Sequence, residues 1–353
     1  DSMVRLDIEE TKSRITTTVP LLLKKHSVPG AAVALFVDEE VVFACGYGVR
    51  YAGEQNPIDQ HTVFDGASLA KPVFSYGVLG LVRDGKIDLD RPISDYLEKP
   101  YIKGDERIYK ITARMVLSHT SGFPNWRPDF WTSSDSGIEI SKVPGSLKIQ
   151  YEPGSRFKYS AEGFNYLQTA VEKISNDRLD RFIKNRVLDQ LGMSRSSFIW
   201  MEDYESNCVM PHNNEGIKVN QWRWRPKRPL AAGSFFTTAA DYARFFCATL
   251  MAKEKPHSDE NHFRISNLDS LLQPQIKIQK NFAWSLVWGI EKHETESYFF
   301  QWGDNPGIKH FAASSSTQKI GVIVLTNGQN GLRVCRPLVE TVLGDELAAF
   351  DNI

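Results

Sequence analysis

Residues 64–85 read FDGASLAKPVFSYGVLGLVRDG and contain an S-x-x-K pattern, Ser68 to Lys71. Apolar residues follow at helical spacing as far as Gly85, which predicts a helix that begins near Ser68. Pro72 fits the first turn of a helix, because an N–H there has no partner within the helix. Residues three apart share a helix face, so the Lys71 ammonium would reach the Ser68 hydroxyl. The helix N-terminus would also favour negative charge developing on the serine.

The same pattern occurs at two other places, Ser155–Lys158 and Ser316–Lys319. The first follows Pro153-Gly154 and is expected in a loop, and the second is expected in a turn between strands. The pattern alone leaves open that Ser68 is only an N-cap serine beside a solvated lysine. Its place at the start of a predicted helix therefore singles out Ser68.

Two further segments carry candidate functional groups. Residues 153–161 read PGSRFKYSA and lead into a helical pattern, with Tyr159 at the entry. Such a tyrosine is often only a packed amphipathic side chain. If Tyr159 lies near Lys71, we expect the cation to lower the pKa of the phenol and make it a usable base. Residues 300–307 read FQWGDNPG at the end of a predicted strand, where glycine allows close backbone approach.

The two ends of the chain predict an antiparallel sheet. The N-terminal part predicts a helix over 6–25 and strands over 31–37 and 41–49, joined by an acidic turn at 38–40. The C-terminal part predicts four strands and a closing helix, over 284–290, 297–302, 308–313, 320–326 and 332–350. The fold class is therefore α/β (α+β), with a sheet domain of residues 1–66 plus 275–353. Residues 67–274 form a mostly helical domain, and the site is expected in the crevice between the two.

The composition excludes some partners. The 353 residues are 41% hydrophobic and 24% charged, with a net charge of −1, so no global field attracts nucleic acid or an anionic membrane. Apolar runs fall far short of the roughly 20 residues that span a bilayer. The segment WRWRPKR at 222–228 resembles a base-stacking platform, but the net charge favours a surface loop or a pocket rim. We therefore expect a small-molecule substrate, no nucleic acid and no membrane span. The sequence does not specify the oligomeric state.

Cysteine and histidine spacing predicts neither disulfides nor a metal site. The cysteines are Cys45, Cys208, Cys247 and Cys335, without a CxxC among them. Cys247 is expected to be a buried small hydrophobe. The histidines considered as ligands, which lack metal-site spacing, are His119, His212 and His310. The N-terminus carries no signal-peptide pattern, so either a signal was removed or Met3 is the true start. We expect a cytoplasmic protein, with a periplasmic or secreted mature form as the alternative.

In order and spacing, these motifs resemble the serine β-lactamase and penicillin-binding protein superfamily. The nearest members are class C β-lactamases, D,D-peptidases, D-aminopeptidases and family VIII carboxylesterases. S-x-x-K matches Ser68–Lys71, Y-x-N begins at Tyr159, and K-T-G or H-x-G falls on Gln301–Gly303. Three other segments agree with the family pattern: VPGA at 28–31, LSHTSGFP at 117–124, and AAGS to TAAD over 231–241.

The resemblance implies a mechanism and a set of site residues. Ser68 would be the acylated nucleophile, with Lys71 and Tyr159 sharing its proton. Backbone N–H groups of Ser68 and Asp304 would form the oxyanion hole. The predicted substrate-binding residues are Gln301, Trp302, Gly303 and Asp304. No metal or organic cofactor is implied, and which of Lys71 and Tyr159 is the resting base stays open.

Two departures from the family pattern suggest the substrate class. The asparagine of Y-x-N is Ala161, and the cation or histidine of the third motif is Gln301. We therefore expect an esterase or amidase acting on small esters or amides, with weak or no β-lactamase activity. The alternatives are a β-lactamase or D-amino-acid peptidase, a biosynthetic acyltransferase, and a penicillin-binding sensor that does not turn over. Lys309 or the 223–228 cluster would be another source of a cation. Candidate pocket walls are Trp126, Trp131 and Trp302.

Overall fold

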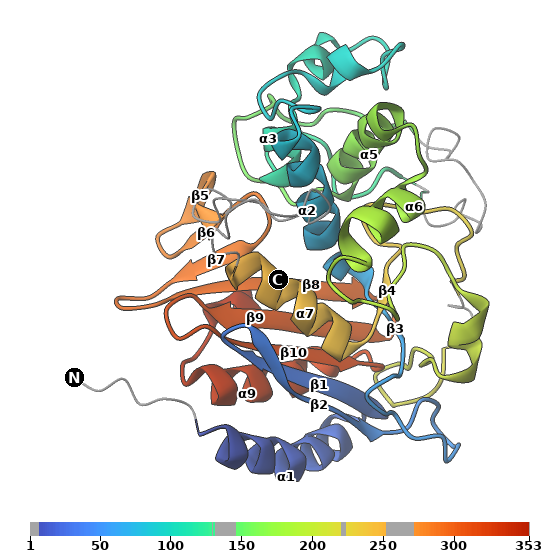
Figure 1. The fold of residues 1–353 in the computed structure, drawn as a ribbon, viewed down its shortest axis with the longest axis vertical. Helices are drawn as coiled ribbons and strands as arrows, with labels where there is room; N and C mark the ends of the chain where they lie inside the picture. Colours follow the sequence, from blue (N-terminus) through green and yellow to red (C-terminus); the bar gives the residue numbers. More distant parts are fainter. Residues whose placement is uncertain (1–6, 129, 131–145, 220–223, 252–271, 353) are drawn as a thin grey trace.

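The computed structural model describes residues 7–128, 130, 146–219, 224–251 and 272–352 (Figure 1). Trp131 and residues 222–223, which the sequence analysis singled out, lie outside this part of the chain. Among the described helices, none is long and apolar enough to cross a membrane.

Within the described residues, one antiparallel sheet has the strand order β2-β1-β10-β9-β8-β7-β6-β5. Its strands are β1 (Gly30–Val37), β2 (Glu40–Gly48), β5 (Ile276–Gln279), β6 (Phe282–Trp284), β7 (Gly289–Lys292), β8 (Ser297–Asn305), β9 (Ile308–Ser315) and β10 (Ile320–Thr326). Both ends of the chain meet in the centre, where β1 pairs with β10 from Ala31 opposite Thr326 to Val37 opposite Ile320. The predicted sheet built from both termini is confirmed.

Helices cover both faces of this sheet (Figure 1). α7 (Ala239–Met251) packs on β1, β2 and β10, while α1 (Ile8–His26) and α9 (Gly331–Leu343) pack on the opposite face. Alternate residues of β1 therefore enter two different apolar cores, with Phe36 on the α7 side and Leu35 on the α1 and α9 side. This double burial explains why β1 is an unbroken apolar run.

The predicted single strand over 284–290 is wrong, because residues 285–288 turn the chain between β6, which ends at Trp284, and β7, which begins at Gly289. The Ser285 hydroxyl accepts hydrogen bonds from the N–H groups of Val287 and Trp288 at 3.1 and 2.8 Å. Both flanking strands are short, so their apolar residues and those of the turn merge into one apolar run in the sequence.

The closing helix is shorter than the predicted 332–350. α9 stops at Leu343, and Gly344 follows with φ 74, the left-handed conformation that ends a helix. A short 3₁₀ helix, η7 (Ala348–Asp351), comes after it. Leu347 and Ala349 are buried in the same core as α9, so the apolar pattern continues after the helix has ended.

The remaining helices form the upper part of the molecule in Figure 1: α2 (Ala70–Arg83), α3 (Ala113–Leu117), α5 (Ala161–Ser175) and α6 (Leu179–Ile183). Short 3₁₀ turns at 93–96, 106–110 and 202–206 and a π-helical turn at 184–188 join them to their neighbours. The boundaries of the two predicted domains stay a prediction. One apolar core includes residues of β1, α2, α5 and α7, so the helical part and the sheet are packed together.

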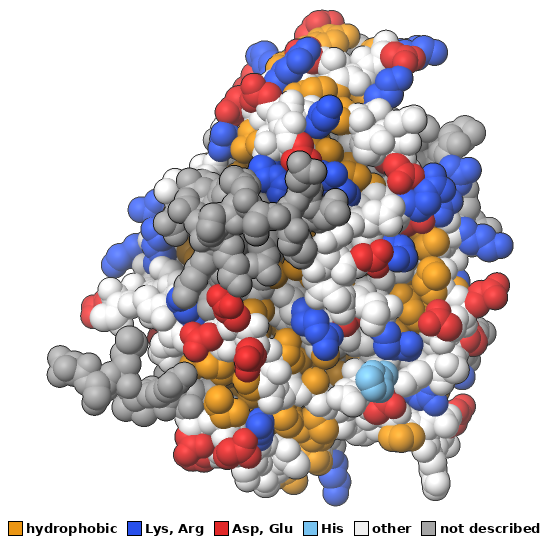
Figure 2. Space-filling model, in the orientation of Figure 1, with side chains coloured by type: hydrophobic (Ala, Val, Ile, Leu, Met, Phe, Trp, Pro, Cys, Tyr) orange, Lys and Arg blue, Asp and Glu red, His pale blue; other side chains and the backbone are white. Residues whose placement is uncertain are grey.

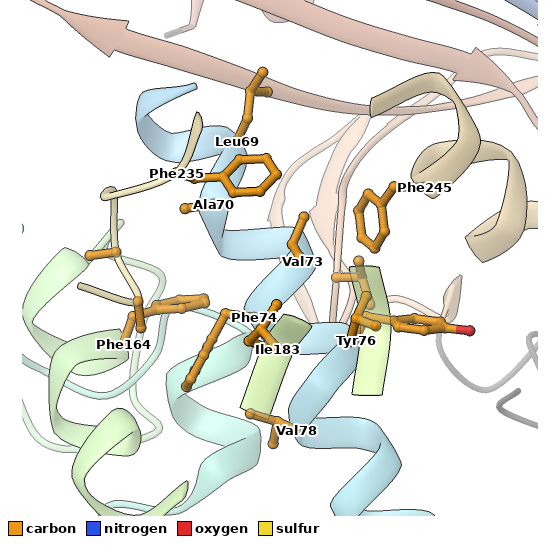
Figure 3. Close-up of a cluster of buried hydrophobic side chains, with 14 of the residues drawn as sticks. Leu69, Ala70, Val73, Phe74, Tyr76, Val78, Phe164, Ile183, Phe235 and Phe245 are labelled. Atoms are coloured by element: carbon orange, nitrogen blue, oxygen red, sulfur yellow. The ribbon is translucent and has the colours of Figure 1, made fainter. Parts of the chain in front are cut away.

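α2 is buried along almost its whole length, from Ala70 to Leu81. A helix that is surrounded by protein can be apolar on every side, as this one is. Figure 3 shows Phe74 against Phe164 of α5 on one flank and Tyr76 against Phe245 of α7 on the other. Packing from both parts of the molecule therefore holds α2 in place.

Candidate active site

Ser68 lies in a tight turn, η1 (Ala67–Leu69), directly before α2. Ala67 has φ 48, a left-handed conformation that costs energy for any residue with a side chain. The Ala67 N–H donates to Asp65 Oδ1 at 2.9 Å. The O–H of Tyr242 in α7 donates to the Leu69 carbonyl at 3.0 Å. These bonds hold the turn that presents Ser68.

The same turn is anchored to the sheet. Asp65 Oδ2 accepts a hydrogen bond from Asn305 Nδ2 at 2.9 Å, at the end of β8. β8 also approaches the turn so closely that a Cβ on Gly303 would lie 2.7 Å from the Gly66 carbonyl oxygen. Gly303 thus allows a close backbone approach to the serine turn, while the predicted approach of this strand to a substrate stays a prediction.

A buried histidine of β9, paired with Gly303 of β8, completes this anchor. His310 Nδ1 accepts from the Thr326 N–H at 3.0 Å, so Nε2 carries the hydrogen and donates to the Asp65 carbonyl at 2.7 Å. Burial lowers the pKa of His310 to about 4, so the ring is neutral at pH 7. In the sequence, His310 stands out only as a possible metal ligand, and nothing there indicates this role.

Lys71 is 2% exposed, and its Nζ lies 2.9 Å from Ser68 Oγ and 2.8 Å from the Ala232 carbonyl oxygen. None of the ion pairs found among the described residues includes Lys71. Desolvation by burial lowers the pKa of this ammonium to about 7. A large fraction of Lys71 is therefore neutral at physiological pH and can accept a proton.

Tyr159 is held between ring planes just before α5. Its ring stacks on His119 at 4.3 Å and 22°, and on Trp302 at 4.9 Å and 29°. Lys71 Nζ lies over the ring face, 4.9 Å from its centroid. The next residue, Ser160, caps α5 by accepting from the Gly163 N–H at 3.0 Å, which fixes the backbone beside the tyrosine.

The predicted lowering of the Tyr159 pKa is wrong. Burial raises the pKa of this phenol to about 12, and the hydrogen-bond interactions with Ser68 and Gln301 offset only part of that effect. Lys71 faces the ring rather than the oxygen, and its own charge is weakened by burial. Tyr159 is therefore protonated at neutral pH and acts there as a hydrogen-bond donor.

Gln301 is fully buried and faces Tyr159. Its Nε2 donates to the Tyr159 hydroxyl at 3.1 Å and to the Trp302 carbonyl at 3.0 Å. Its Oε1 is one of the buried side-chain atoms without a hydrogen-bond partner in the described part of the chain. The sequence predicted a substrate contact here, and the structure places the amide against the tyrosine.

Asp304 and Lys309 form an ion pair across β8 and β9. The Asp304 side chain is 54% exposed, whereas Lys309 is 8% exposed and also donates to the Asn305 carbonyl at 3.3 Å. Lys309 was a possible source of the missing cation, but the Asp304 carboxylate compensates its charge. The oxyanion role of the Asp304 N–H stays a prediction.

His119 is a residue of the site whose role was not predicted: from the sequence it was weighed only as a metal ligand and as part of the LSHTSGFP segment. Its Nδ1 accepts from the Ser160 N–H at 3.0 Å, and its carbonyl accepts from the Lys158 N–H at 2.7 Å. Burial and the nearby Lys71 hold the pKa of His119 well below its ordinary value. A neutral imidazole thus fixes the backbone on both sides of Tyr159. The sequence signal for this residue was the LSHTSG motif, but the motif gives no indication that His119 bonds to Ser160.

The other aromatic and basic candidates lie in separate contacts. Trp126 packs on Phe130 at 4.6 Å, and this pair joins a small apolar cluster with Trp224. Arg225 pairs with Glu205 and lies 4.1 Å from the Trp200 ring. Lys and Arg side chains are interspersed with Asp and Glu on the face shown in Figure 2, as the net charge leads one to expect.

Residues 15–338 match the family model described as Beta-lactamase. The chain belongs to the β-lactamase family. The resemblance drawn from the ordered motifs is thereby confirmed, and it extends over most of the chain.

One curated relative and two solved structures are similar to this chain over most of its length. Penicillin-binding protein 4 of Amycolatopsis lactamdurans is 26% identical over 341 residues, 92% of this chain and 87% of that protein. The structure is similar to a class C β-lactamase with a TM-score of 0.80 and 18% identity, covering 98% of both chains. It is also similar to the D-alanine carboxypeptidase AmpC from Burkholderia cenocepacia, with a TM-score of 0.77 and 17% identity over 96% of this chain and 99% of that one.

The predicted fold class is therefore confirmed, and the chain is a member of a serine hydrolase family. The structure brings the first two motifs and the third strand of that family together around Ser68. The individual roles of these residues and the substrate stay predictions.

Proposed function

We propose that this protein is a serine hydrolase that forms an acyl-enzyme on Ser68 and acts on small esters or amides. The observation that carries the proposal is the pair of Lys71 and Ser68, 2.9 Å apart, with the lysine buried and its pKa lowered to about 7. A neutral amine beside a hydroxyl is a general base suited to activate a nucleophile near pH 7.

Ser68, Lys71 and Tyr159 can carry out every proton transfer of the acylation step. Ser68 gives its O–H proton to Lys71 Nζ while Oγ bonds to the carbonyl carbon of the substrate. The negative charge on the carbonyl oxygen is stabilised by the backbone N–H groups of Ser68 and Asp304, as the family resemblance implies. Tyr159 protonates the leaving oxygen or nitrogen as its bond to carbon breaks, and the Lys71 ammonium returns a proton to the phenolate. Water then releases the acid and restores Ser68.

The environment of the site supports neutral substrates. Ala161 is buried in the first turn of α5 and offers no side-chain donor or acceptor, and Gln301 is buried against Tyr159. Lys309 is already paired with Asp304. A charge-assisted hydrogen bond contributes about 1.5–3 kcal/mol and a neutral one about 1 kcal/mol. Losing both weakens amides that carry a carboxylate by roughly 100-fold, whereas neutral esters need neither contact.

A substrate panel tests this preference. We expect kcat/KM for short-chain aryl esters to exceed that for nitrocefin or benzylpenicillin by at least about 100-fold, as estimated from the lost hydrogen bonds. Comparable rates on esters and β-lactams would refute it. Adding alcohol or amine acceptors to the ester assay distinguishes a biosynthetic acyltransferase. Intact-mass detection of an adduct without turnover distinguishes a penicillin-binding sensor.

One observation favours the alternative, a β-lactamase or D-amino-acid peptidase. Asn125 lies beside Ala161, where the family asparagine is missing, and its Oδ1 accepts from the Ala161 N–H at 3.0 Å. Its carbonyl accepts from the Glu162 N–H at 3.0 Å, so the residue is fixed there. An exposed amide at this place would bind a substrate acylamide. Under this alternative, Asn125→Ala lowers kcat/KM for nitrocefin but not for aryl esters.

A further inference from the structure

The hydrogen bonds of Gln301 fix which atom donates at each contact. An amide nitrogen has two hydrogens and accepts none, and Gln301 Nε2 directs them to the Tyr159 hydroxyl and the Trp302 carbonyl. Flipping the amide would place Oε1 3.0 Å from a carbonyl oxygen, which also only accepts. The Trp302 carbonyl therefore sets the orientation of Gln301, and Tyr159 is the acceptor in its contact with Gln301.

This orientation has consequences for Tyr159 and Ser68. Because the Tyr159 oxygen already accepts from Gln301, its own hydrogen is available for Ser68, whose hydroxyl is within hydrogen-bonding reach. A Ser68 oxygen that accepts from Tyr159 directs its own hydrogen towards Lys71 Nζ, 2.9 Å away. Lys71 in turn donates to the Ala232 carbonyl. The contacts form one chain that runs from Gln301 to Tyr159, Ser68 and Lys71.

We propose that Gln301 is a positioning residue that sets the direction of this chain, so that Ser68 gives its proton to Lys71 and Tyr159 gives its proton to the leaving group. The inference rests on the proposed acyl-enzyme at Ser68 and deepens it. Lys71 is then the resting base and Tyr159 the acid in acylation. The residue that departs from the cation or histidine of the family motif thereby decides a question that the motifs alone leave open.

The surrounding charges leave Lys71 as the group whose titration controls the chain near pH 7. The titratable and charged groups that face Lys71 and Tyr159 from the neighbouring elements are His119, Tyr242, Asp304 and Lys309. His119 is neutral, and burial keeps Tyr242 protonated because it raises the pKa of that phenol. Asp304 and Lys309 compensate one another. The acid limb of kcat/KM, which reports the free enzyme, should therefore lie near pH 7.

A series of substitutions at this one position tests the inference, with phenyl acetate hydrolysis measured from pH 5 to 10. Gln301→Glu replaces a donor by a carboxylate that accepts from Tyr159, so kcat should fall by roughly 10²–10³-fold. Gln301→Met removes the donor at similar size and should lower kcat by about tenfold. Gln301→Lys keeps a donor to Tyr159 and adds a cation. Its kcat should therefore stay within about fivefold of wild type, a smaller loss than the tenfold expected when the donor is removed. The cation should also move the acid limb to lower pH, because it favours neutral Lys71.

A purely structural role predicts a different result. All three variants would then lose stability in proportion to kcat, and none would move the acid limb. Equal kcat values for the Met and wild-type proteins, or an unmoved acid limb in Gln301→Lys, would overturn the inference. If the Glu variant does not fold, the Met and Lys variants still distinguish a positioning role from a structural one, provided that thermal unfolding shows both to be folded.

Intact-mass measurement of the adduct separates this inference from the function beneath it. If wild-type protein forms no acyl adduct on Ser68, the proposed function fails, and the inference fails with it. If Ser68 is acylated but kcat does not fall in the order Gln301→Lys, Gln301→Met, Gln301→Glu, only the inference is contradicted.

Discussion

At Ser68–Lys71 the lysine is buried and its Nζ lies 2.9 Å from the serine hydroxyl. At Ser316–Lys319, where the same S-x-x-K spacing recurs, the serine hydroxyl donates to Glu296 Oε1 at 2.6 Å. Lys319 there occupies a turn between β9 and β10 with φ 54. The four-residue spacing is identical, but only the first serine is paired with an amine that burial has made a base.

The difference between the two regions is a difference in secondary structure and in charge. The first pattern lies at the start of a buried helix, so positions i and i+3 converge on one face. The second lies in a turn whose hydroxyl and N–H groups surround a carboxylate, Glu296. A carboxylate that accepts hydrogen bonds stabilises the turn and gives the serine no base. We therefore expect reactivity in this chain to depend on the surroundings of the pattern.

The largest expected effect on activity comes from changing Lys71, and the same change at Lys319 is its control. Lys71→Arg keeps the positive charge but cannot become neutral, so kcat should fall by at least about 10³-fold. Lys319→Arg, the matched control, should stay within twofold in the same ester assay. If the two variants retain similar activity, the distinction between the two regions is lost.

The buried lysine also predicts an effect on stability. Its pKa falls from 10.5 to about 7 on folding, so the unfolded chain binds more protons between these values and stability rises with pH there. Below pH 7 the folded protein carries the full cost of burying the cation. Lys71→Met should therefore raise the Tm at pH 6 by about 2 °C or more, because removing a cost of several kcal/mol outweighs the smaller shift per kcal/mol of a chain longer than about 250 residues. A lower Tm in a calorimetric scan would contradict the burial argument.

The second-largest effect on turnover concerns the tyrosine. Tyr159→Phe keeps the ring stacked between His119 and Trp302 but removes the hydroxyl. We expect kcat to fall by about 10²–10⁴-fold with the Tm nearly unchanged. The double variant with Lys71→Ala should be less than additive, since both residues act in one proton relay through Ser68. Activity within threefold of wild type would mean that Tyr159 only packs.

The smallest effect on activity is expected at Glu296. Burial opposes its charge, but hydrogen bonds from Ser315, Ser316 and Thr317 prevail and lower its pKa from 4.5 to about 2. A lowered pKa contributes stability that is present above pH 4.5 and is lost as the pH falls towards 2. Glu296→Gln should therefore be less stable than wild type at pH 7, with the difference shrinking below pH 4.5, while ester turnover at pH 7 stays unchanged. A pH-independent difference in denaturant midpoint would show that the carboxylate charge is not what holds this turn.

Much of this arrangement follows from the sequence. The pairing of both chain ends, the start of α2 and the choice of Ser68 over Ser316 rest on local periodicity and turn residues, which are properties of short segments. The hairpin at Ser285 and the end of α9 were missed because buried residues in a turn and buried residues in a strand or helix look alike in sequence. The raised pKa of Tyr159 depends on burial by residues far away in the chain, which no motif records.

The roles of Gln301 and His119 also needed coordinates. Gln301 differs from the family residue, so the sequence indicated a lost contact but not its new partner, Tyr159. His119 and Ser160 are 41 residues apart, and their hydrogen bond depends on the folded turn. Distances between such residues are set by tertiary packing, and a single sequence carries no measure of them.

The central claim is that Ser68 alone among the three S-x-x-K serines is acylated. Its most direct test is to treat the protein with a fluorophosphonate probe or a slow aryl ester, digest it, and locate the added mass by peptide sequencing. We predict one adduct on the peptide containing Ser68, none in Ser68→Ala, and unchanged labelling in Ser155→Ala and Ser316→Ala. An adduct on Ser155 or Ser316, or labelling that persists in Ser68→Ala, would contradict it.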